Sequence, residues 1–248
     1  MIATARLSLV AFLILVCLAC AGSPRGAGNR AGKEGPAMDS AKPGDLSRVD
    51  HVILGINDLQ QGIDDLERLT GVRAAFGGVH PGRGTQNALI SLGDGHYLEI
   101  LAPNLGERSG IETDYLRALT SLRPVGWAVH TDDLIALQKR LRDRGVETEE
   151  IRPGARDRPD GTHLAWKTLD YAASTRLLPF FIEWDRAGAH PSTSSPEGCR
   201  LRGLYLEDPS PDALREALDA AGLKLGVRAA QEAGLRLSLV CPKGNVDF

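Results

Sequence analysis

The chain has 248 residues, of which 42% are hydrophobic, 25% are charged and 5% are aromatic. This composition is typical of a globular protein and excludes fibrous, collagen-like and wholly disordered chains. The 29 Lys and Arg residues are outnumbered by 32 Asp and Glu residues, so the formal net charge is −3 and nothing favours binding to a nucleic acid backbone. At roughly 100–200 residues per domain, the length fits one large domain or two small ones.

The N-terminus has the pattern of an export signal over residues 1–20. Arg6 precedes an apolar run at residues 7–19, and small residues follow this run. The run is shorter than the roughly 20 residues that span a bilayer, so we expect a signal peptide and no transmembrane helix. Residues 21–47 are rich in Gly, Ala, Ser and Pro and have no apolar periodicity, which predicts a flexible linker before a domain at residues 48–248.

Two cleavage sites fit this signal. Ala19-Cys20-Ala21 satisfies the small-x-small rule of ordinary signal peptidase, whereas Leu18-Ala19-Cys20 resembles a bacterial lipoprotein box. Cys17 departs from that box, because lipoproteins usually carry Leu at this position. We favour the second site, which predicts lipidation of Cys20 and an extracytoplasmic protein anchored to the membrane. A periplasmic or secreted protein without lipid is the alternative.

Two cysteines remain in the predicted domain, Cys199 and Cys241. An oxidising compartment would allow them to form a disulfide, and two unpaired buried thiols are the alternative. No Cys-x-x-Cys motif occurs, which excludes a thiolate zinc ribbon and a thioredoxin-like redox site.

The first part of the domain, at about residues 48–104, has the predicted order strand, helix and three strands. Its helix begins after Asp58 and ends at Gly71, because apolar residues repeat at helical spacing between these two signals. The Gly-rich residues 77–84 are predicted to form a loop. The strands of this βαβββ unit are expected at Val49–Leu54, Val72–Phe76, Asn87–Leu92 and Tyr97–Ala102.

The second part, at about residues 123–186, repeats this order. Asp132-Asp133 begins its helix and Gly145 ends it. Residues 152–161 contain Pro, Gly and alternating charges, which predicts a long exposed loop. The strands of the second unit are expected at Val125–His130, Val146–Ile151, His163–Leu169 and Pro179–Trp184.

A third segment, residues 201–248, is expected to be an incomplete copy of the unit. It has a strand at Leu201–Leu206, a helix that begins at Ser210-Pro211, and another strand at Leu235–Cys241. A single unit leaves one apolar sheet face uncovered, so tandem units are expected to pack around a shared cleft. The sequence therefore predicts an α+β fold of tandem βαβββ units with an extra C-terminal βα-containing segment.

Three polar residues interrupt otherwise apolar predicted strands: His51, Glu99 and Glu183. An unpaired buried carboxylate is costly, so something is expected to compensate these charges. One imidazole and two carboxylates are a suitable ligand set for a divalent Mn, Fe, Ni, Zn or Mg ion. The alternative for each residue is structural: a solvated cleft histidine and two glutamates paired with Arg or Lys.

Five segments between Arg48 and Cys241 carry a resemblance to a known family. Taken in order, with the repeated unit between them, they resemble the glyoxalase-like domain family of the vicinal oxygen chelate superfamily. The resemblance implies a divalent metal held by one residue from the first and one from the last strand of each unit. Members of the superfamily polarise vicinal oxygens of a substrate, or bind drugs without chemistry. The segments are Arg48–Leu54, Gly84–Leu89, Tyr97–Pro103, Leu178–Trp184 and His190-Pro191.

The resemblance implies that His51 and Glu99 are metal ligands from the first unit and that Glu183 is a ligand from the second. The fourth ligand position falls at Gly126 when the two units are aligned by their helices, and glycine has no side chain to coordinate a metal. This departure separates the chain from standard lactoylglutathione lyases. His130 has the strand parity of Gly126 but lies at the strand end, so it is a surface histidine first and a ligand second.

Substrate-binding residues are expected from the same strands. Asn87 could donate a hydrogen bond from the third strand of the first unit, and His163 lies in the comparable strand of the second. Trp127, Trp166 and Phe181 are the aromatic residues expected to line the cleft. For Asn87 and His163, a side chain satisfied by its own loop or by solvent is the alternative.

Two functions remain open at this stage. The first is a metal-dependent lyase, isomerase or oxygenase that acts on a small molecule with vicinal oxygens, in which Glu183 moves a proton. The second is a binding protein that holds a hydrophobic small molecule in the same cleft without turning it over. The three candidate ligands favour the enzyme, whereas Gly126 and the predicted export favour the binding protein.

Overall fold

The computed structural model describes residues 44–104, 106, 110–158, 160–173, 175–186 and 188–248. The predicted signal peptide, Cys20 and most of the predicted linker therefore lie outside the described residues. The last linker residues, 44–47, lie against the domain, since the Asp45 N–H donates to the Lys224 carbonyl (2.8 Å) and Leu46 packs on the core. Among the described helices, none has the length and apolar character needed to cross a membrane.

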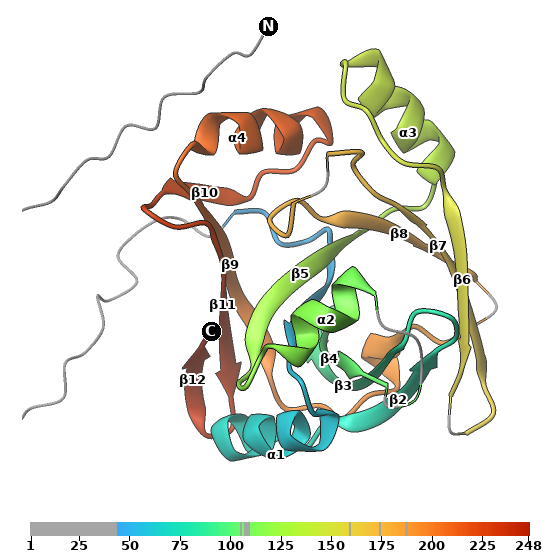
Figure 1. Cartoon of the computed structure of the whole chain (residues 1–248), viewed down its shortest axis with the longest axis vertical. Helices are drawn as coiled ribbons and strands as arrows, with labels where there is room; N and C mark the ends of the chain where they lie inside the picture. The colour runs from blue at the N-terminus through green and yellow to red at the C-terminus, as the bar shows by residue number, and fades with distance from the viewer. Residues whose placement is uncertain (1–43, 105, 107–109, 159, 174, 187) are drawn as a thin grey trace, which may run out of the picture. The chain divides into compact units, whose positions relative to one another are not determined.

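Two βαβββ units form one eight-stranded sheet (Figure 1), which confirms the predicted α+β fold of tandem units. The strand order is β2-β3-β4-β1-β5-β8-β7-β6, and the antiparallel pairing of β1 with β5 joins the two units. In each unit the first strand runs parallel to the last. The first unit comprises β1 (Val49–Gly55), α1 (Leu59–Thr70), β2 (Ala75–His80), β3 (Thr85–Gly93) and β4 (His96–Pro103), and the second β5 (Arg123–His130), α3 (Leu134–Asp143), β6 (Arg152–Asp157), β7 (His163–Leu169) and β8 (Phe180–Trp184).

The helices begin where the sequence signals place them. Asp58 and Asp133 accept hydrogen bonds from the backbone N–H groups of Gln61 and Ala136, so each aspartate satisfies a free donor of the first helical turn. Apolar residues on one face of each helix are buried against the sheet. A short helix that the sequence pattern did not indicate, α2 (Ile111–Arg117), connects the two units.

The third segment contains the complete element order rather than the expected incomplete copy. Its strands form a separate sheet of order β10-β9-β11-β12. Strand β9 pairs with β10 and β11, whereas the first strand of the other units pairs with the last. The same order of elements therefore gives a different sheet, which packs beside β5 through β11. Its elements are β9 (Arg200–Asp208), α4 (Pro211–Ala220), β10 (Gly226–Ala229), β11 (Gly234–Cys241) and β12 (Gly244–Asp247).

Two strand predictions were wrong, both in Gly-rich or Pro-rich stretches. Strand β2 begins at Ala75 and continues through Gly77 and Gly78 to His80, where a loop was expected. A Cβ at Gly77 would overlap the Asn87 side chain, so glycine allows these two strands to approach closely. Strand β6 occupies residues 152–157 of the predicted exposed loop, whereas the expected strand at residues 146–151 contributes only an isolated bridge. Pro153 is compatible with this position because β6 lies at the sheet edge.

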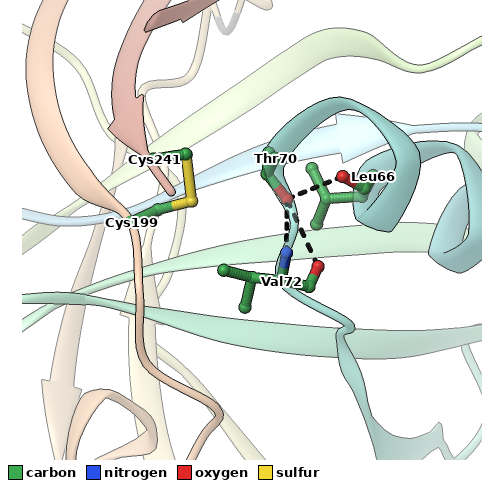
Figure 2. Close-up of a disulfide and its surroundings, with 5 residues drawn as sticks. All are labelled: Leu66, Thr70, Val72, Cys199 and Cys241. Carbon is green, nitrogen blue, oxygen red and sulfur yellow. Dashed lines mark hydrogen bonds between the residues drawn. A yellow bond between two sulfur atoms is a disulfide. The ribbon is translucent and has the colours of Figure 1, made fainter. Parts of the chain in front are cut away.

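A disulfide between Cys199 and Cys241 connects the start of the third unit to the end of β11 (Figure 2). Both cysteines are buried in the main core. Nearby, the Thr70 hydroxyl at the end of α1 donates to the Leu66 carbonyl (2.6 Å) and accepts from the Val72 N–H (3.1 Å), which fixes the chain as it leaves the helix (Figure 2).

Replacing both Cys199 and Cys241 by Ala should lower the free energy of unfolding by about 2–4 kcal/mol, because the bond closes a loop of 42 residues in the unfolded chain. Guanidinium unfolding of the two proteins measures the difference. A reductant should shift the wild-type midpoint toward that of the variant and leave the variant unchanged. Equal midpoints without reductant would contradict a stabilising role of the disulfide.

Candidate functional site

Both units contribute to a cavity of about 610 Å³. Imidazole, amide and carboxylate groups of the first unit lie together in one part of its lining, called here the polar side, and aromatic and apolar residues of the second unit, called here the apolar side, line it beside the charged Glu149, Arg152 and Asp170. Such a combination of an apolar wall with a few convergent polar groups is typical of small-molecule sites. The polar side carries His51, His80, Asn87, Glu99 and Arg156, and the apolar side carries Trp166, Phe180, Ile182 and Trp184.

Glu99 lies at the centre of the polar side. Its side chain is buried, and Asn87 Nδ2 donates a hydrogen bond to Glu99 Oε1 (2.8 Å). His51 Nε2 lies 3.6 Å from Oε2, and His80 Nε2 lies 3.8 Å from Oε1. The carboxylate is thus held by one amide between two imidazole rings, at distances to the rings that are longer than hydrogen bonds.

Asp50 and His51 are consecutive in β1, yet their side chains meet. His51 Nδ1 lies 2.7 Å from Asp50 Oδ1. Side chains of consecutive residues in a regular strand point to opposite faces, but the β1–β5 pairing has an irregularity between Val49 and His51. Burial would raise the pKa of Asp50, but hydrogen bonds from His130, His190 and His51 outweigh burial and hold it well below its ordinary value.

Aromatic stacking fixes the plane of the His51 ring. The ring stacks on Tyr97 at 4.4 Å between centroids, and Phe180 approaches it edge-on at 5.4 Å. Burial, with the nearby Asp50 and Glu99 carboxylates, raises the pKa of the Tyr97 hydroxyl well above its ordinary value. Tyr97 therefore remains a neutral phenol beside the imidazole.

Arg156 extends from β6 into the polar side of the cavity. It is 4% exposed and donates to the Gly77 carbonyl of β2. Burial lowers the pKa of Arg156, and the charge of Glu99 opposes this shift. Burial also lowers the pKa of His80, again against the effect of Glu99. Arg156 therefore connects the two edge strands and brings a positive charge close enough to interact with this carboxylate.

A second cavity of about 1340 Å³ shares two lining residues, Trp166 and Trp184, with the first. Asp50 borders this second cavity, where Trp184 Nε1 (3.0 Å) and His190 Nε2 (3.2 Å) contact Asp50 Oδ2. His130 also lines it, with Nδ1 3.7 Å from the same oxygen.

The structure does not bring Glu183 to His51 and Glu99. Glu183 borders the second cavity, where Oε2 accepts the Leu134 N–H at the start of α3 (2.9 Å) and Oε1 lies 3.3 Å from Lys167 Nζ. On β8, the residues that face the first cavity alternate as Phe180, Ile182 and Trp184, so Glu183 points to the opposite face. Phe181 was also expected to line this cavity. This prediction was wrong, because Phe181 lies on the same face of β8 as Glu183.

The pairing register explains why the second unit lacks ligands. In the first unit Ile53 pairs with Glu99, whereas in the second Ala128 pairs with Phe180 and His130 with Ile182. The positions of β8 that correspond to Glu99 on the cavity side are thus apolar. Gly126, the fourth ligand position implied by the resemblance, pairs with Ile53 of β1 and is not among the residues that line the first cavity.

The other residues predicted to bind a substrate lie in three different environments. Asn87 and Trp166 line the first cavity as expected. Trp127 is buried in the core, where its indole N–H donates to the Leu177 carbonyl (2.8 Å), and Phe181 is also fully buried there. His163 is exposed and contacts Asp157 (2.7 Å), so it corresponds to the solvent-satisfied alternative.

The described residues do not fit the metal set that the resemblance implies. Members of the superfamily often use divalent metals, and His51 Nε2 and Glu99 Oε2 are two donors of the right kind. Within the described parts of the chain, however, no group of three or more His, Cys, Asp or Glu side chains could hold a metal ion. Only two of the four implied ligand positions, His51 and Glu99, therefore come together in the site.

Three residues of the site were missed by the sequence interpretation. Asp50 was not a candidate, because a regular strand would place it on the face opposite His51, and the two side chains meet next to an irregularity in the β1–β5 pairing. His80 and Arg156 lie in segments whose Gly and Pro content predicted loops. The adjacent Asp50-His51 pair was visible in the sequence, but a regular strand would have separated the two side chains.

Paired βαβββ units around a cavity that both units line define a protein of the vicinal oxygen chelate superfamily. The sequence profile of one family in it, described as Glyoxalase-like domain, matches residues 49–222. The chain belongs to this glyoxalase-like family. A comparison with curated proteins gives no match.

Solved structures are similar to this chain at low sequence identity. A hypothetical protein from Staphylococcus aureus has a TM-score of 0.60 and 17% identity, over 81% of this chain and 98% of that chain. Methylmalonyl-CoA epimerase from Mycobacterium tuberculosis has a TM-score of 0.45 and 19% identity, over 61% and 95%. A Streptomyces coelicolor methylmalonyl-CoA epimerase in complex with 2-nitronate-propionyl-CoA has a TM-score of 0.42 and 20% identity, over 55% and 96%.

The Glu183→Gln variant should be less stable than wild type by about 0.5–1 kcal/mol, because the substitution removes a negative charge from the N-terminal end of α3. Thermal unfolding measures the loss. Replacing the exposed Glu216 by Gln is the matched control and should leave the melting temperature unchanged. A Glu183→Gln protein as stable as this control would argue against a helix-terminal role.

Proposed function

We propose that the protein binds, in the first cavity, a small molecule with an apolar or aromatic body and adjacent oxygen substituents. The observation that carries the proposal is that one cavity is lined both by aromatic residues and by a cluster in which His51 and Asn87 converge on Glu99. The apolar body would contact Trp166, Phe180 and Trp184, and the oxygen substituents would face the polar side.

The charges around the cavity support a ligand of small net charge. Three arginines and three carboxylates line it, so their formal charges balance. Arg152 lies 3.9 Å from the carboxylates of both Glu149 and Asp170, and Arg156 compensates Glu99. A highly charged ligand would have to displace these interactions, whereas hydroxyl and carbonyl groups can be bound alongside them. The six residues are Arg83, Arg152 and Arg156, and Glu99, Glu149 and Asp170.

A lyase or isomerase activity is the second candidate, with Glu99 rather than Glu183 as the group that moves a proton. Glu99 Oε2 is on the cavity side of a buried carboxylate, and a positioned carboxylate can accept a proton from the carbon next to a carbonyl group. Such an activity would transfer deuterium from D2O into a ligand such as acetoin, which has vicinal oxygens and an acidic C–H bond. Binding alone would leave acetoin unlabelled.

Catechol carries two adjacent hydroxyl groups on an aromatic ring and serves as the probe of the proposed binding. Wild type should bind catechol, and the Glu99→Gln variant should bind it about 10–100-fold more weakly, because a hydrogen bond to a charged acceptor contributes about 1.5–3 kcal/mol. Isothermal titration calorimetry measures both affinities.

Glu183→Gln is the matched control for this titration, because it removes a carboxylate that lies outside the first cavity and should leave catechol affinity unchanged. Equal weakening by Glu99→Gln and Glu183→Gln would place the probe elsewhere. No binding of catechol to a folded wild-type protein would contradict the proposed ligand class.

We also propose that the chain is exported and lipidated at Cys20. The apolar run at residues 7–19 and the small residues after it support this location, and the Cys199–Cys241 disulfide is typical of an oxidising compartment. Labelled palmitate should enter the wild-type protein in bacteria and be absent from Cys20→Ala. Equal labelling of both proteins would exclude Cys20 as the lipid site, and a soluble wild-type product without label would support simple secretion.

A further inference from the structure

The two ring nitrogens of His51 face two different carboxylates at different distances. Nδ1 lies 2.7 Å from Asp50 Oδ1, and Nε2 lies 3.6 Å from Glu99 Oε2. The first distance is that of a hydrogen bond and the second is too long for one. An ionised carboxylate can only accept hydrogen bonds, so the nitrogen next to Asp50 must carry the proton. The opposite tautomer would place the Nδ1 lone pair against a carboxylate oxygen.

Asp50 is well suited to hold this proton in place. Its side chain is 1% exposed, and its second oxygen is fixed by Trp184 Nε1 at 3.0 Å and His190 Nε2 at 3.2 Å. These contacts leave the carboxylate little freedom to turn away from His51.

With Nδ1 protonated, a neutral His51 presents the lone pair of Nε2 to the cavity. Glu99 Oε2 is a second acceptor beside it, because the hydrogen bond from Asn87 goes to the other oxygen, Oε1. Among the described residues, no donor is in hydrogen-bond range of both acceptors. A pair of acceptors 3.6 Å apart is complementary to two donor protons of a ligand, such as those of two adjacent hydroxyl groups, one for each acceptor.

We propose that Asp50 is a positioning residue: by fixing the Nδ1–H tautomer of His51, it makes the cavity select ligands that donate hydrogen bonds. The ligand preference rests on the proposed binding function. The tautomer is a property of the free protein and does not depend on it.

The tautomer can be measured directly in protein labelled with ¹⁵N-histidine. Long-range ¹H–¹⁵N spectra distinguish a protonated ring nitrogen from an unprotonated one, and the His51→Gln spectrum identifies the His51 signals. Wild-type His51 should have Nδ1 protonated and Nε2 unprotonated. The Asp50→Asn variant should shift toward Nε2–H, because Glu99 is then the nearest carboxylate to the ring.

The exposed pair His163–Asp157 provides the matched control. Its Nδ1–Oδ1 distance is also 2.7 Å, but both side chains are exposed. Asp157→Asn should therefore leave the His51 signals unchanged. A wild-type His51 with a proton on Nε2, or the same His51 pattern in wild type and Asp50→Asn, would overturn the proposal. If Asp50→Asn does not fold, the wild-type spectrum alone still decides it.

The ligand preference is tested with catechol and 1,2-dimethoxybenzene, which has the same adjacent oxygens but no hydroxyl protons. Wild type should bind catechol at least about tenfold more tightly, and Asp50→Asn should reduce this ratio to about twofold or less. An unchanged ratio in a folded Asp50→Asn protein would overturn the proposed selection. If neither compound binds wild type, the proposed function fails, whereas the tautomer result is read independently from the spectra.

Discussion

The antiparallel pairing of β1 with β5 is the interaction on which the site depends. It joins two units into one sheet, so that residues of the first unit face residues of the second across a common cavity. Its irregularity after Val49 also allows Asp50 and His51 to meet, although they are neighbours in a strand. The join between the units therefore determines both the presence of the cavity and the orientation of its central imidazole.

The two units are alike in backbone and different in chemistry. The first contributes His51 and Glu99, while the cavity-facing positions of β8 in the second are occupied by Phe180 and Ile182. Apolar residues at these positions replace a second pair of possible ligands by a surface suited to an aromatic or aliphatic ligand. The resemblance implies metal ligands from both units, whereas in this chain only the first unit places such residues in the cavity.

Regular elements of the fold were predictable from the sequence, because helix caps and apolar periodicity report local structure. Strands β2 and β6 were not, since Gly77, Gly78 and Pro153 are unfavourable in strands and are accepted here only through tertiary contacts. For the site, His51, Asn87 and Glu99 were found as polar residues in apolar strands. Glu183 was assigned to the wrong face of its strand. Alternation along the sequence shows which residues share a face, but the pairing register is needed to show which face lines the cavity.

The distribution of the three tryptophans has a practical meaning. Trp127 is buried in the core, whereas Trp166 and Trp184 line both cavities, with their ring centroids 5.4 Å apart. Indole emission depends on the polarity around the ring, so the fluorescence of these two tryptophans should respond to a ligand in either cavity. Ligand binding can therefore be followed by intrinsic fluorescence, to which the buried Trp127 contributes a constant signal.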